Sequence, residues 1–219
     1  MRLVTVVGSA SLGAAVGRLL TLALILMPRW VASTRKKTPP PRAHRYVAPL
    51  LNALLFGCLS ARWGWSWRFV GYALVGSCLL LLALIDGWYH VVPNLIVYPA
   101  LVLSLGGQLA LHGTTGALNA LLAGGLAFGF FFAVALLSRG GMGGGDVKLV
   151  ALIGVLVGFP EVLWALSSGI LVGGTAAIVL LATTDREDER QMPYAPFLCL
   201  GALVALLWDP LPWLLETLL

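Results

Sequence analysis

Charged residues are scarce in this sequence of 219 residues. Asp, Glu, Lys and Arg together make up 11% of the chain, against about 25% in soluble domains, whereas hydrophobic residues make up 59%. So few polar side chains cannot cover the surface of a water-soluble globule. The composition therefore excludes an intrinsically disordered chain, a soluble Rossmann-type enzyme and a nucleic-acid-binding protein. It predicts a protein whose main solvent is the lipid bilayer.

Cysteine is also rare, and its spacing excludes the usual metal and disulfide frameworks. Cys58, Cys78 and Cys199 lie singly within apolar segments, and no C-x-x-C pair occurs. The chain also lacks the H-E-x-x-H, G-x-S-x-G and P-loop motifs. We therefore predict no metal site, no disulfide and no cofactor.

Long apolar segments fill most of the chain and predict an all-α fold, a polytopic membrane helical bundle. A helix needs about 20 apolar residues to cross the hydrocarbon core, and shorter segments fit inside a bundle. The first segment is longer than a signal-peptide core and more spans follow it, so we interpret it as a retained helix. We predict about eight transmembrane spans (six to eight), at residues 3–27, 47–61, 69–86, 91–111, 116–137, 147–159, 161–182 and 194–215.

The basic residues indicate the orientation of these spans. If the loop at 29–45 is cytoplasmic, alternation along the chain makes 87–90, 138–148 and 183–193 cytoplasmic too, and ten of the fourteen Lys and Arg residues then lie inside. The positive-inside rule favours this orientation. The net charge of +5 is therefore interpreted as a topology signal and not as a nucleic-acid-binding patch.

Small and aromatic residues predict how the helices pack and where they meet the interface. Four G-x-x-x-G pairs favour close helix contacts: Gly13/Gly17, Gly125/Gly129, Gly154/Gly158 and Gly169/Gly173. Tryptophans gather near the ends of the predicted spans, as interfacial anchors do: Trp63, Trp65, Trp67, Trp208 and Trp213.

Two of the nine acidic residues lie at the edge of predicted spans, at the cytoplasmic end. Asp86 ends the apolar run LLLLALID, and Asp146 follows the glycine-rich run GGMGGG. A carboxylate in such a setting costs on the order of 2–3 kcal/mol, so it is a functional-site candidate. The simpler alternative is that each acid marks the point where a helix leaves the lipid. Asp146 is also placed to act as a helix N-cap.

Two neighbouring carboxylates would suit peptide hydrolysis. Close together they cannot both ionise, so the pair shares a proton. One carboxylate then deprotonates a water, while the protonated partner polarises the peptide carbonyl and later donates to the leaving amine. Because the pair titrates as a unit, neither role is assigned to one residue.

Several neighbours are candidates for supporting or substrate-binding roles. Pro93 is expected in the first turn of the following helix, beside Asn94, and Gly143 and Gly145 allow backbone to approach a bound peptide. Lys148 either orients a substrate carbonyl or is an ordinary cytoplasmic charge. His90 either tunes Asp86 or is an ordinary interfacial histidine, which is the favoured interpretation.

Three segments together resemble the type IV prepilin peptidases, a family of GxGD-type aspartic membrane proteases. IDGWYHVVPNLIVYPALVLSL (85–105) is similar to their first catalytic segment, and GMGGGDVKLVALIGVLVG (141–158) is similar to their G-x-G-D segment. MPYAPFLCLGALVALLW (192–208) resembles their closing span, with Tyr194 in place of a Phe, and 45–65 resembles the segment that opens their membrane core.

This resemblance implies a function and a domain organisation. It implies that Asp86 and Asp146 form the catalytic pair of a prepilin leader peptidase. The enzyme would be multi-pass in the inner (plasma) membrane and would cut the short basic leader of prepilins or pseudopilins after a Gly, at the cytoplasmic face. Residues 1–46 are expected to form an N-terminal transmembrane helix and a short basic loop, and 47–219 the membrane-embedded aspartic peptidase domain.

The sequence departs from bifunctional members of that family. Those members carry a cytoplasmic insert with two C-x-x-C pairs, associated with zinc and N-methylation, whereas the loop at 29–45 has no cysteine. We therefore predict a peptidase without methyltransferase activity, with the basic loop suited to anionic lipid headgroups. The acidic loop at 184–190 either steers a basic leader or is simply solvated. The alternatives from other classes are a small proton- or cation-coupled membrane transporter component using the same aspartates, and a non-catalytic assembly factor.

Overall fold

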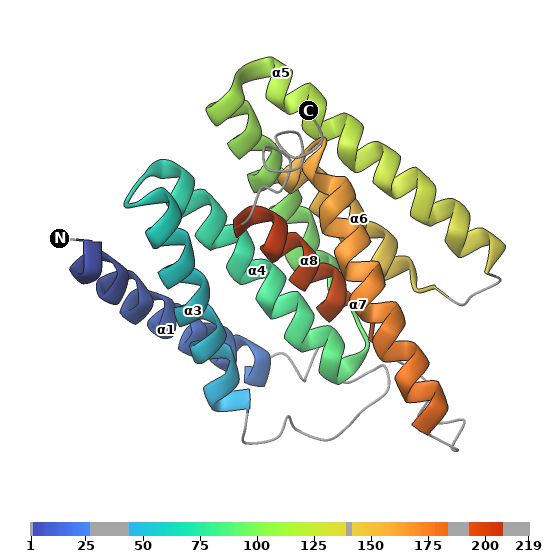
Figure 1. The fold of residues 1–219 in the computed structure, drawn as a ribbon, viewed down its shortest axis with the longest axis horizontal. Helices are drawn as coiled ribbons and strands as arrows, with labels where there is room; N and C mark the ends of the chain where they lie inside the picture. Colours follow the sequence, from blue (N-terminus) through green and yellow to red (C-terminus); the bar gives the residue numbers. More distant parts are fainter. Residues whose placement is uncertain (1, 27–43, 139–141, 184–192, 208–219) are drawn as a thin grey trace, which may run out of the picture.

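All of the regular structure in the described part of the chain is helical, as predicted. The computed structural model describes residues 2–26, 44–138, 142–183 and 193–207. Seven helices occur there (Figure 1): α1 (Arg2–Leu26), α3 (His44–Trp63), α4 (Trp67–Tyr89), α5 (Asn94–Leu137), α6 (Gly144–Val157), α7 (Glu161–Thr183) and α8 (Ala195–Leu207). Residues 29–43 of the predicted loop 29–45, residues 184–192 of the predicted loop 183–193, and the last part of the predicted span 194–215 lie outside the described residues.

Helix α5 is a hairpin of two helical arms. Its backbone leaves helical geometry at Gly113 (φ 69°, ψ −161°), a conformation that glycine adopts without strain. Figure 1 shows that α5 reverses its direction part-way along, so that its two arms form a hairpin. The two predicted spans 91–111 and 116–137 correspond to these arms.

Four helices are long and apolar enough to cross a membrane. They contain the stretches Val4–Leu24, Trp67–Tyr89, Asn94–Leu137 and Glu161–Leu180, and α8 is a shorter apolar helix. The chain is therefore a multi-pass membrane protein, and the finer count of eight spans stays a prediction.

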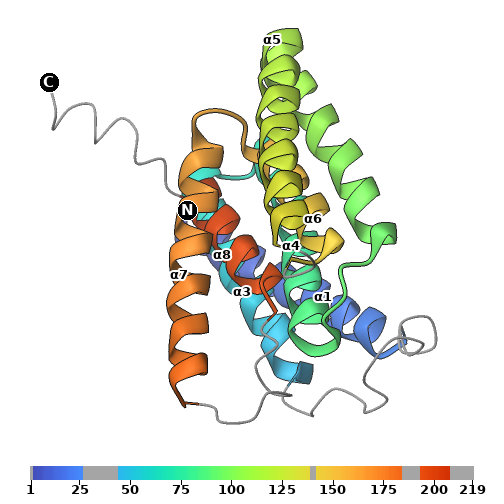
Figure 2. The ribbon, with the colours of Figure 1, turned by 90° about the vertical axis from the view of Figure 1, so that its right-hand side faces the viewer.

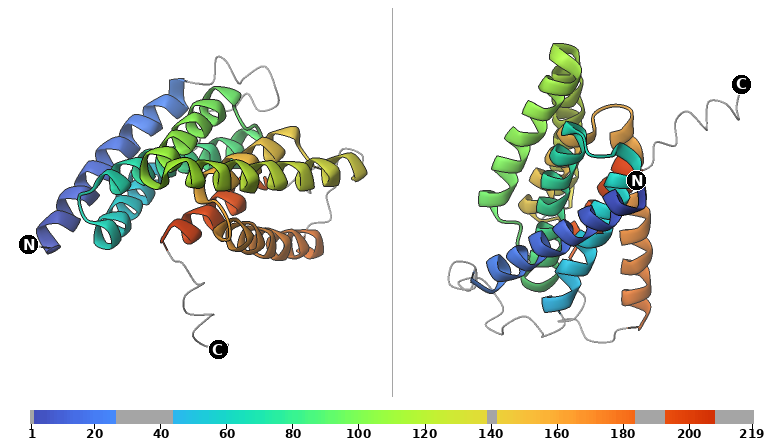
Figure 3. Two further views of the ribbon diagram at one scale, coloured as in Figure 1. Left: turned by 90° about the horizontal axis from the view of Figure 1, so that it is seen from above. Right: turned by 90° about the vertical axis from the view of Figure 1, so that its left-hand side faces the viewer.

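The core forms where α4, α6 and α8 meet. Helix α6 packs in the α5 hairpin, α8 packs against both α4 and α7, and α1 packs along α3. Figure 2 shows α8 and α6 between α7 and the arms of α5, and Figure 3 shows α1 at the edge opposite α7. The largest fully buried side chains include Leu79, Leu82, Leu149, Leu152, Ile153 and Leu198. Helices α4 and α6, which carry the two candidate aspartates, both pack against α8 in this core.

Close helix contacts occur at both glycines of Gly13/Gly17 and Gly169/Gly173 and at Gly154, whereas Gly158 follows α6 and makes no close contact. A Cβ on Gly13 would lie 2.5 Å from the Asn52 carbonyl oxygen, and one on Gly169 would lie 3.0 Å from the Leu198 Cα. A Cβ on Gly154 would lie 2.7 Å from the Cα of Gly124. The prediction for Gly125/Gly129 was wrong, because both face open space and the neighbouring Gly124 makes the contact instead.

Candidate active site

The two candidate aspartates line one cavity of about 300 Å³. Its walls come from the end of α4, the connection to α5 and the start of α6. The lining residues are Asp86, His90, Val91, Val92, Asn94, Gly143, Gly145, Asp146 and Lys148. All the predicted site residues except Pro93 therefore meet at one place, although 60 positions separate the two aspartates in the sequence.

Asp86 is buried in the last turns of α4 and is held by the start of α8. Its side chain is 5% exposed, and its Oδ2 accepts a hydrogen bond from the backbone N–H of Ala195 at 3.2 Å. Ala195 is the first residue of α8, so its N–H is one of the donors that a helix leaves free at its N-terminus. This contact holds one carboxylate oxygen of Asp86 in place.

Asp146 lies in the first turn of α6 and is not its N-cap. The N-cap is Gly143, whose carbonyl oxygen accepts a hydrogen bond from the Asp146 N–H at 3.1 Å. The predicted N-cap position was therefore wrong by three residues, because the helix already begins within the glycine run. The half-buried carboxylate of Asp146 consequently sits at the positive end of the α6 dipole, which favours its charged form.

The glycine run brings α6 close to the α4–α5 connection. A Cβ on Gly145 would lie 2.9 Å from the Cβ of Val92, closer than two such atoms approach in proteins. A Cβ on Gly143 would lie 3.4 Å from Oδ2 of Asp146. Gly145 is thus required for packing, and the lack of a side chain at Gly143 keeps the Asp146 carboxylate open to the cavity.

Lys148 ties the start of α6 to the start of α5. Its Nζ donates to Oδ1 of Asn94 at 3.1 Å and lies 5.9 Å from the centre of the Tyr98 ring. Because the amide and the ring are neutral, the positive charge of Lys148 is not cancelled by them. Pro93 is the N-cap residue of α5 and precedes its first turn by one position, so its predicted location was wrong by one residue.

His90 lines the same cavity. It is the one non-glycine residue with a positive φ in the described part of the chain (φ 55°, ψ 41°), and it ends α4 in the left-handed conformation. Its N–H donates to the carbonyl oxygen of Asp86 at 2.8 Å. This compact helix end turns the chain back towards α6 directly after Asp86.

The carboxyl group of Asp146 is electrostatically coupled to Asp86. Burial raises the pKa of Asp146 to about 6, the negative charge of Asp86 acts in the same direction, and a backbone hydrogen bond with Gly143 opposes both. A carboxyl with this pKa keeps its proton at pH values where an ordinary carboxyl has already lost it, as expected of a pair that shares one proton. Two interacting carboxyl groups, one of them with a raised pKa, therefore line the same cavity.

The comparison with protein families identifies the chain. Residues 73–180, which include both aspartates, match the sequence model of the type IV leader peptidase family. This chain belongs to the type IV leader peptidase family. The match covers α4 to α7, so the family segment contains every side chain that lines the cavity.

Curated relatives of this leader peptidase family member align beyond the matched segment. The prepilin leader peptidase/N-methyltransferase of Pseudomonas aeruginosa is 30% identical over 74% of this chain and 57% of its own length. The Bacillus subtilis protein of that name is 32% identical over 74% of this chain and 65% of its own length. The Neisseria gonorrhoeae protein is 31% identical over 63% of this chain and 50% of its own length. The chain thus spans about half to two thirds of the relatives it matches, and no solved structure shows a significant match.

One contact of the site lies outside the matched family segment. The hydrogen bond from Ala195 to Asp86 comes from α8, which follows residue 180. Sequence reasoning missed this donor because any residue type supplies a backbone N–H, so no residue pattern marks it. The signal that did exist was the resemblance of 192–208 to the closing span of the family.

Proposed function

We propose that this protein is a prepilin leader peptidase, an aspartic endopeptidase that uses Asp86 and Asp146 to remove the short basic leader of type IV prepilins or pseudopilins. The observation that carries the proposal is the convergence of the two carboxylates, from the end of α4 and the start of α6, on one cavity. Membership of the type IV leader peptidase family supports the same reaction and the same class of substrate.

The reaction follows from one proton held between two acids. The ionised carboxylate takes a proton from a water, and the resulting hydroxide attacks the carbonyl carbon of the scissile peptide bond. The protonated carboxylic acid donates a hydrogen bond to the carbonyl oxygen as negative charge develops there. The tetrahedral intermediate then collapses when a proton passes to the leaving nitrogen, which frees the new amine and leaves the pair with one proton.

The neighbours of the pair position the substrate and the acids. The Ala195 N–H fixes one oxygen of Asp86, so that its orientation does not change when substrate enters. The ammonium of Lys148, already placed by Asn94, lies at the cavity wall and supplies positive charge for a substrate carbonyl. The open backbone at Gly143 gives an extended peptide access to Asp146.

The charge pattern supports an orientation with the active site at the cytoplasmic face of the inner membrane. The cavity lies at the ends of α4 and α6 that adjoin the predicted cytoplasmic loops. A prepilin would keep its apolar helix in the lipid beside the enzyme and present its basic leader at this face. Eight spans, counting the two arms of α5 separately, would place both chain ends on the side of the membrane opposite to the active site.

We also propose that this sequence supplies the peptidase activity alone. The curated relatives are named as both peptidase and N-methyltransferase, whereas this sequence has three single cysteines and no C-x-x-C pair. Mass spectrometry of the processed pilin tests this point. We expect the mass of the trimmed chain with an unmodified N-terminus, and a gain of one methyl group that requires this protein would contradict the proposal.

Co-expression with a candidate prepilin tests the proposed function. The wild-type protein is expected to convert the prepilin to a faster-migrating form that lacks the leader. Asp86→Ala and Asp146→Ala should each abolish the shift while the proteins still accumulate in the membrane. Processing that survives either substitution at the wild-type level would rule out the proposed pair.

A further inference from the structure

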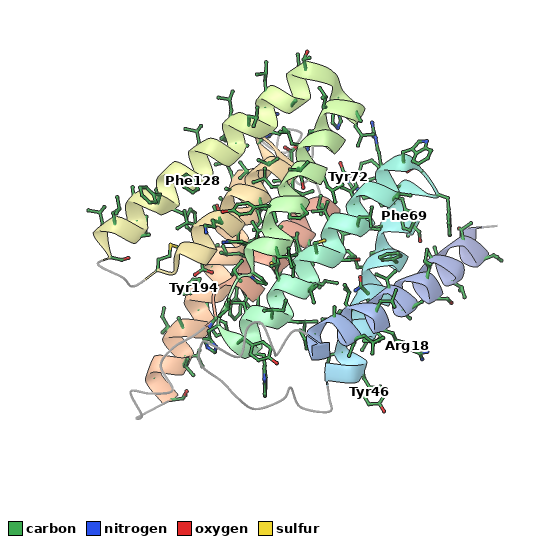
Figure 4. The ribbon with its side chains drawn as sticks, turned by 180° about the vertical axis from the view of Figure 1, so that it is seen from behind. Arg18, Tyr46, Phe69, Tyr72, Phe128 and Tyr194 are labelled. Carbon is green, nitrogen blue, oxygen red and sulfur yellow. The ribbon has the colours of Figure 1, made fainter. Side chains whose placement is uncertain are left out.

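A second and larger cavity lies at the opposite end of the helices that form the active site. It has a volume of about 580 Å³ and is lined by residues that include Tyr72, His112 and Leu156. Tyr72 precedes Asp86 by fourteen positions on α4, which corresponds to about 21 Å along a helix. Figure 4 shows Tyr72 at the end of the molecule away from Tyr194, which directly precedes α8 beside Asp86. The two cavities therefore lie at opposite ends of α4.

Opposite charges face this second cavity without pairing with each other. Arg62, at the end of α3, and Glu161, at the start of α7, both line it. The Arg62 guanidinium donates to the carbonyl oxygen of Leu207 at 2.6 Å, a neutral acceptor. No ion pair joins Arg62 to Glu161 in the described structure, where both are present. The cavity thus offers one cationic wall and one anionic wall to a ligand.

A second guanidinium group, that of Arg68, lies near Arg62. Arg62 and Arg68 both lie over the Trp63 ring, with 5.3 Å and 5.4 Å between the guanidinium carbon and the ring centre. Arg68 lines a small void that shares Tyr72 with the larger cavity. An anion bound beside Arg62 is therefore also attracted by the charge of Arg68. The buried Trp63 Nε1 also has no hydrogen-bond partner in the described part of the chain.

The remaining polar residues of the wall are already used to build it. Gln108 donates to the Leu156 carbonyl oxygen at 2.7 Å, at the end of α6. Asn119 donates to the Phe159 carbonyl oxygen at 2.9 Å and accepts from the Phe159 N–H at 3.0 Å. These bonds hold both arms of α5 to the α6–α7 connection, so the cavity is preformed.

Exposed tryptophans place this end of the molecule at the depth of lipid headgroups. Trp65 and Trp67 follow the cavity-lining residue Trp63 in the sequence, and their side chains are 60% and 86% exposed. Tryptophan with this exposure, next to an apolar membrane helix, is typical of the membrane–water interface. A ligand that reaches the cavity from the bilayer therefore arrives with its headgroup at this level.

We propose that this cavity binds the headgroup of a phospholipid that carries a primary amine, as phosphatidylethanolamine does. The phosphate lies against the guanidinium group of Arg62, with the positive charge of Arg68 nearby across the Trp63 ring, and the ammonium lies against the carboxylate of Glu161. The acyl chains stay in the lipid outside the bundle. The inference does not depend on the proposed peptidase function, because it uses the other end of the fold.

Thermal unfolding of the full-length protein in detergent micelles tests the proposal. A ligand that binds only the folded state, at a concentration one hundred times its Kd, should raise the Tm by about 5 °C or more. We expect this shift with short-chain phosphatidylethanolamine, a much smaller one with phosphatidylglycerol, which lacks the ammonium, and with phosphatidylcholine, whose methylated ammonium cannot donate hydrogen bonds. Equal shifts with the three lipids would overturn the proposal. An equal shift with soluble phosphoethanolamine would overturn the lipid as the ligand.

Two substitutions test the cationic wall and the anionic wall of the site separately. Arg62→Gln should abolish the response to phosphatidylethanolamine, whereas Glu161→Gln should remove the preference for it over phosphatidylglycerol. The control is Arg18→Gln, which removes an exposed arginine on α1 far from the cavity (Figure 4) and should leave the wild-type shift. A wild-type response in both cavity variants would refute the site.

Native mass spectrometry of the wild-type protein keeps the proposal testable if a variant fails to fold. The protein is offered equal amounts of phosphatidylethanolamine and phosphatidylcholine with the same acyl chains. We expect retention of the primary-amine lipid in at least about tenfold excess, and equal retention would contradict the inference.

Discussion

The contact between α5 and α6 should tolerate no side chain larger than hydrogen at Gly154. A Cβ there would lie 2.7 Å from the Gly124 Cα and 2.8 Å from the Ala123 carbonyl oxygen. Both atoms belong to backbone, which cannot rotate away as a side chain does. Gly154→Leu must therefore push α6 away from the second arm of α5, and with it the start of α6, where Asp146 lies.

The magnitude follows from comparison with Gly125, which lies on the second arm of α5 next to the contact residue Gly124. Overpacking of this kind costs about 1–3 kcal/mol, and the backbone position of the clash favours the upper end. Gly125→Leu is the matched control, because a Cβ at Gly125 meets nothing within 4 Å. An exposed substitution away from packing changes stability by about 0.5 kcal/mol at most. The two variants should therefore differ by about 2–3 kcal/mol, roughly 30- to 150-fold in the folding equilibrium.

Unfolding in mixed micelles measures this difference. The protein is titrated with a denaturing detergent, and tryptophan fluorescence reports the folded fraction of the wild type and both variants. We expect Gly154→Leu to unfold at a lower denaturant fraction than the wild type, and Gly125→Leu to unfold close to it. Equal unfolding midpoints for the two variants would show that the close contact between α5 and α6 is wrong.

The active-site geometry leads to three further predictions. Because the pKa of Asp146 is raised to about 6, the pair loses its shared proton as the pH rises through that region, so leader cleavage should fall about tenfold per pH unit on the alkaline side. A rate that stays constant from pH 6 to 9 would contradict this. Gly145→Val should reduce cleavage at least about tenfold by forcing α6 away from the α4–α5 connection, whereas Gly144→Ala, which meets open space, should retain activity in the same gel assay. Lys148→Met should raise KM or lower kcat by roughly tenfold without moving the pH profile, and a profile shifted by a full unit would mean that Lys148 acts through the acids instead.

The sequence was sufficient to predict the helical fold and the residues that meet at the site. Scarcity of charge made each acid conspicuous, so Asp86 and Asp146 could be singled out as candidates from their span-end positions. The turn around Gly113 was predictable because the HGTTG segment separates two apolar runs of spanning length. The Asp86 and Asp146 segments also carry enough residue identity to indicate the family.

Other features depend on three-dimensional packing that a sequence pattern does not encode. The choice of Gly124 over Gly125 as the contact to Gly154 depends on the rotation of the second α5 arm about its axis, which spacing cannot give. The Ala195 N–H reaches Asp86 because α8 begins beside the end of α4. His90 enters the cavity because the left-handed end of α4 folds the chain back, an outcome that its residue type did not predict.

The most direct test of the central claim is the turnover of purified protein on a prepilin in a bilayer. Asp86→Asn and Asp146→Asn keep the size of each side chain and remove its ability to ionise. Each should lower kcat by at least about a thousandfold with the Tm within a few degrees of the wild type, because neither acid alone can both activate water and protonate the leaving amine. Turnover of either variant within tenfold of the wild type would contradict the assignment of these two aspartates as the catalytic pair.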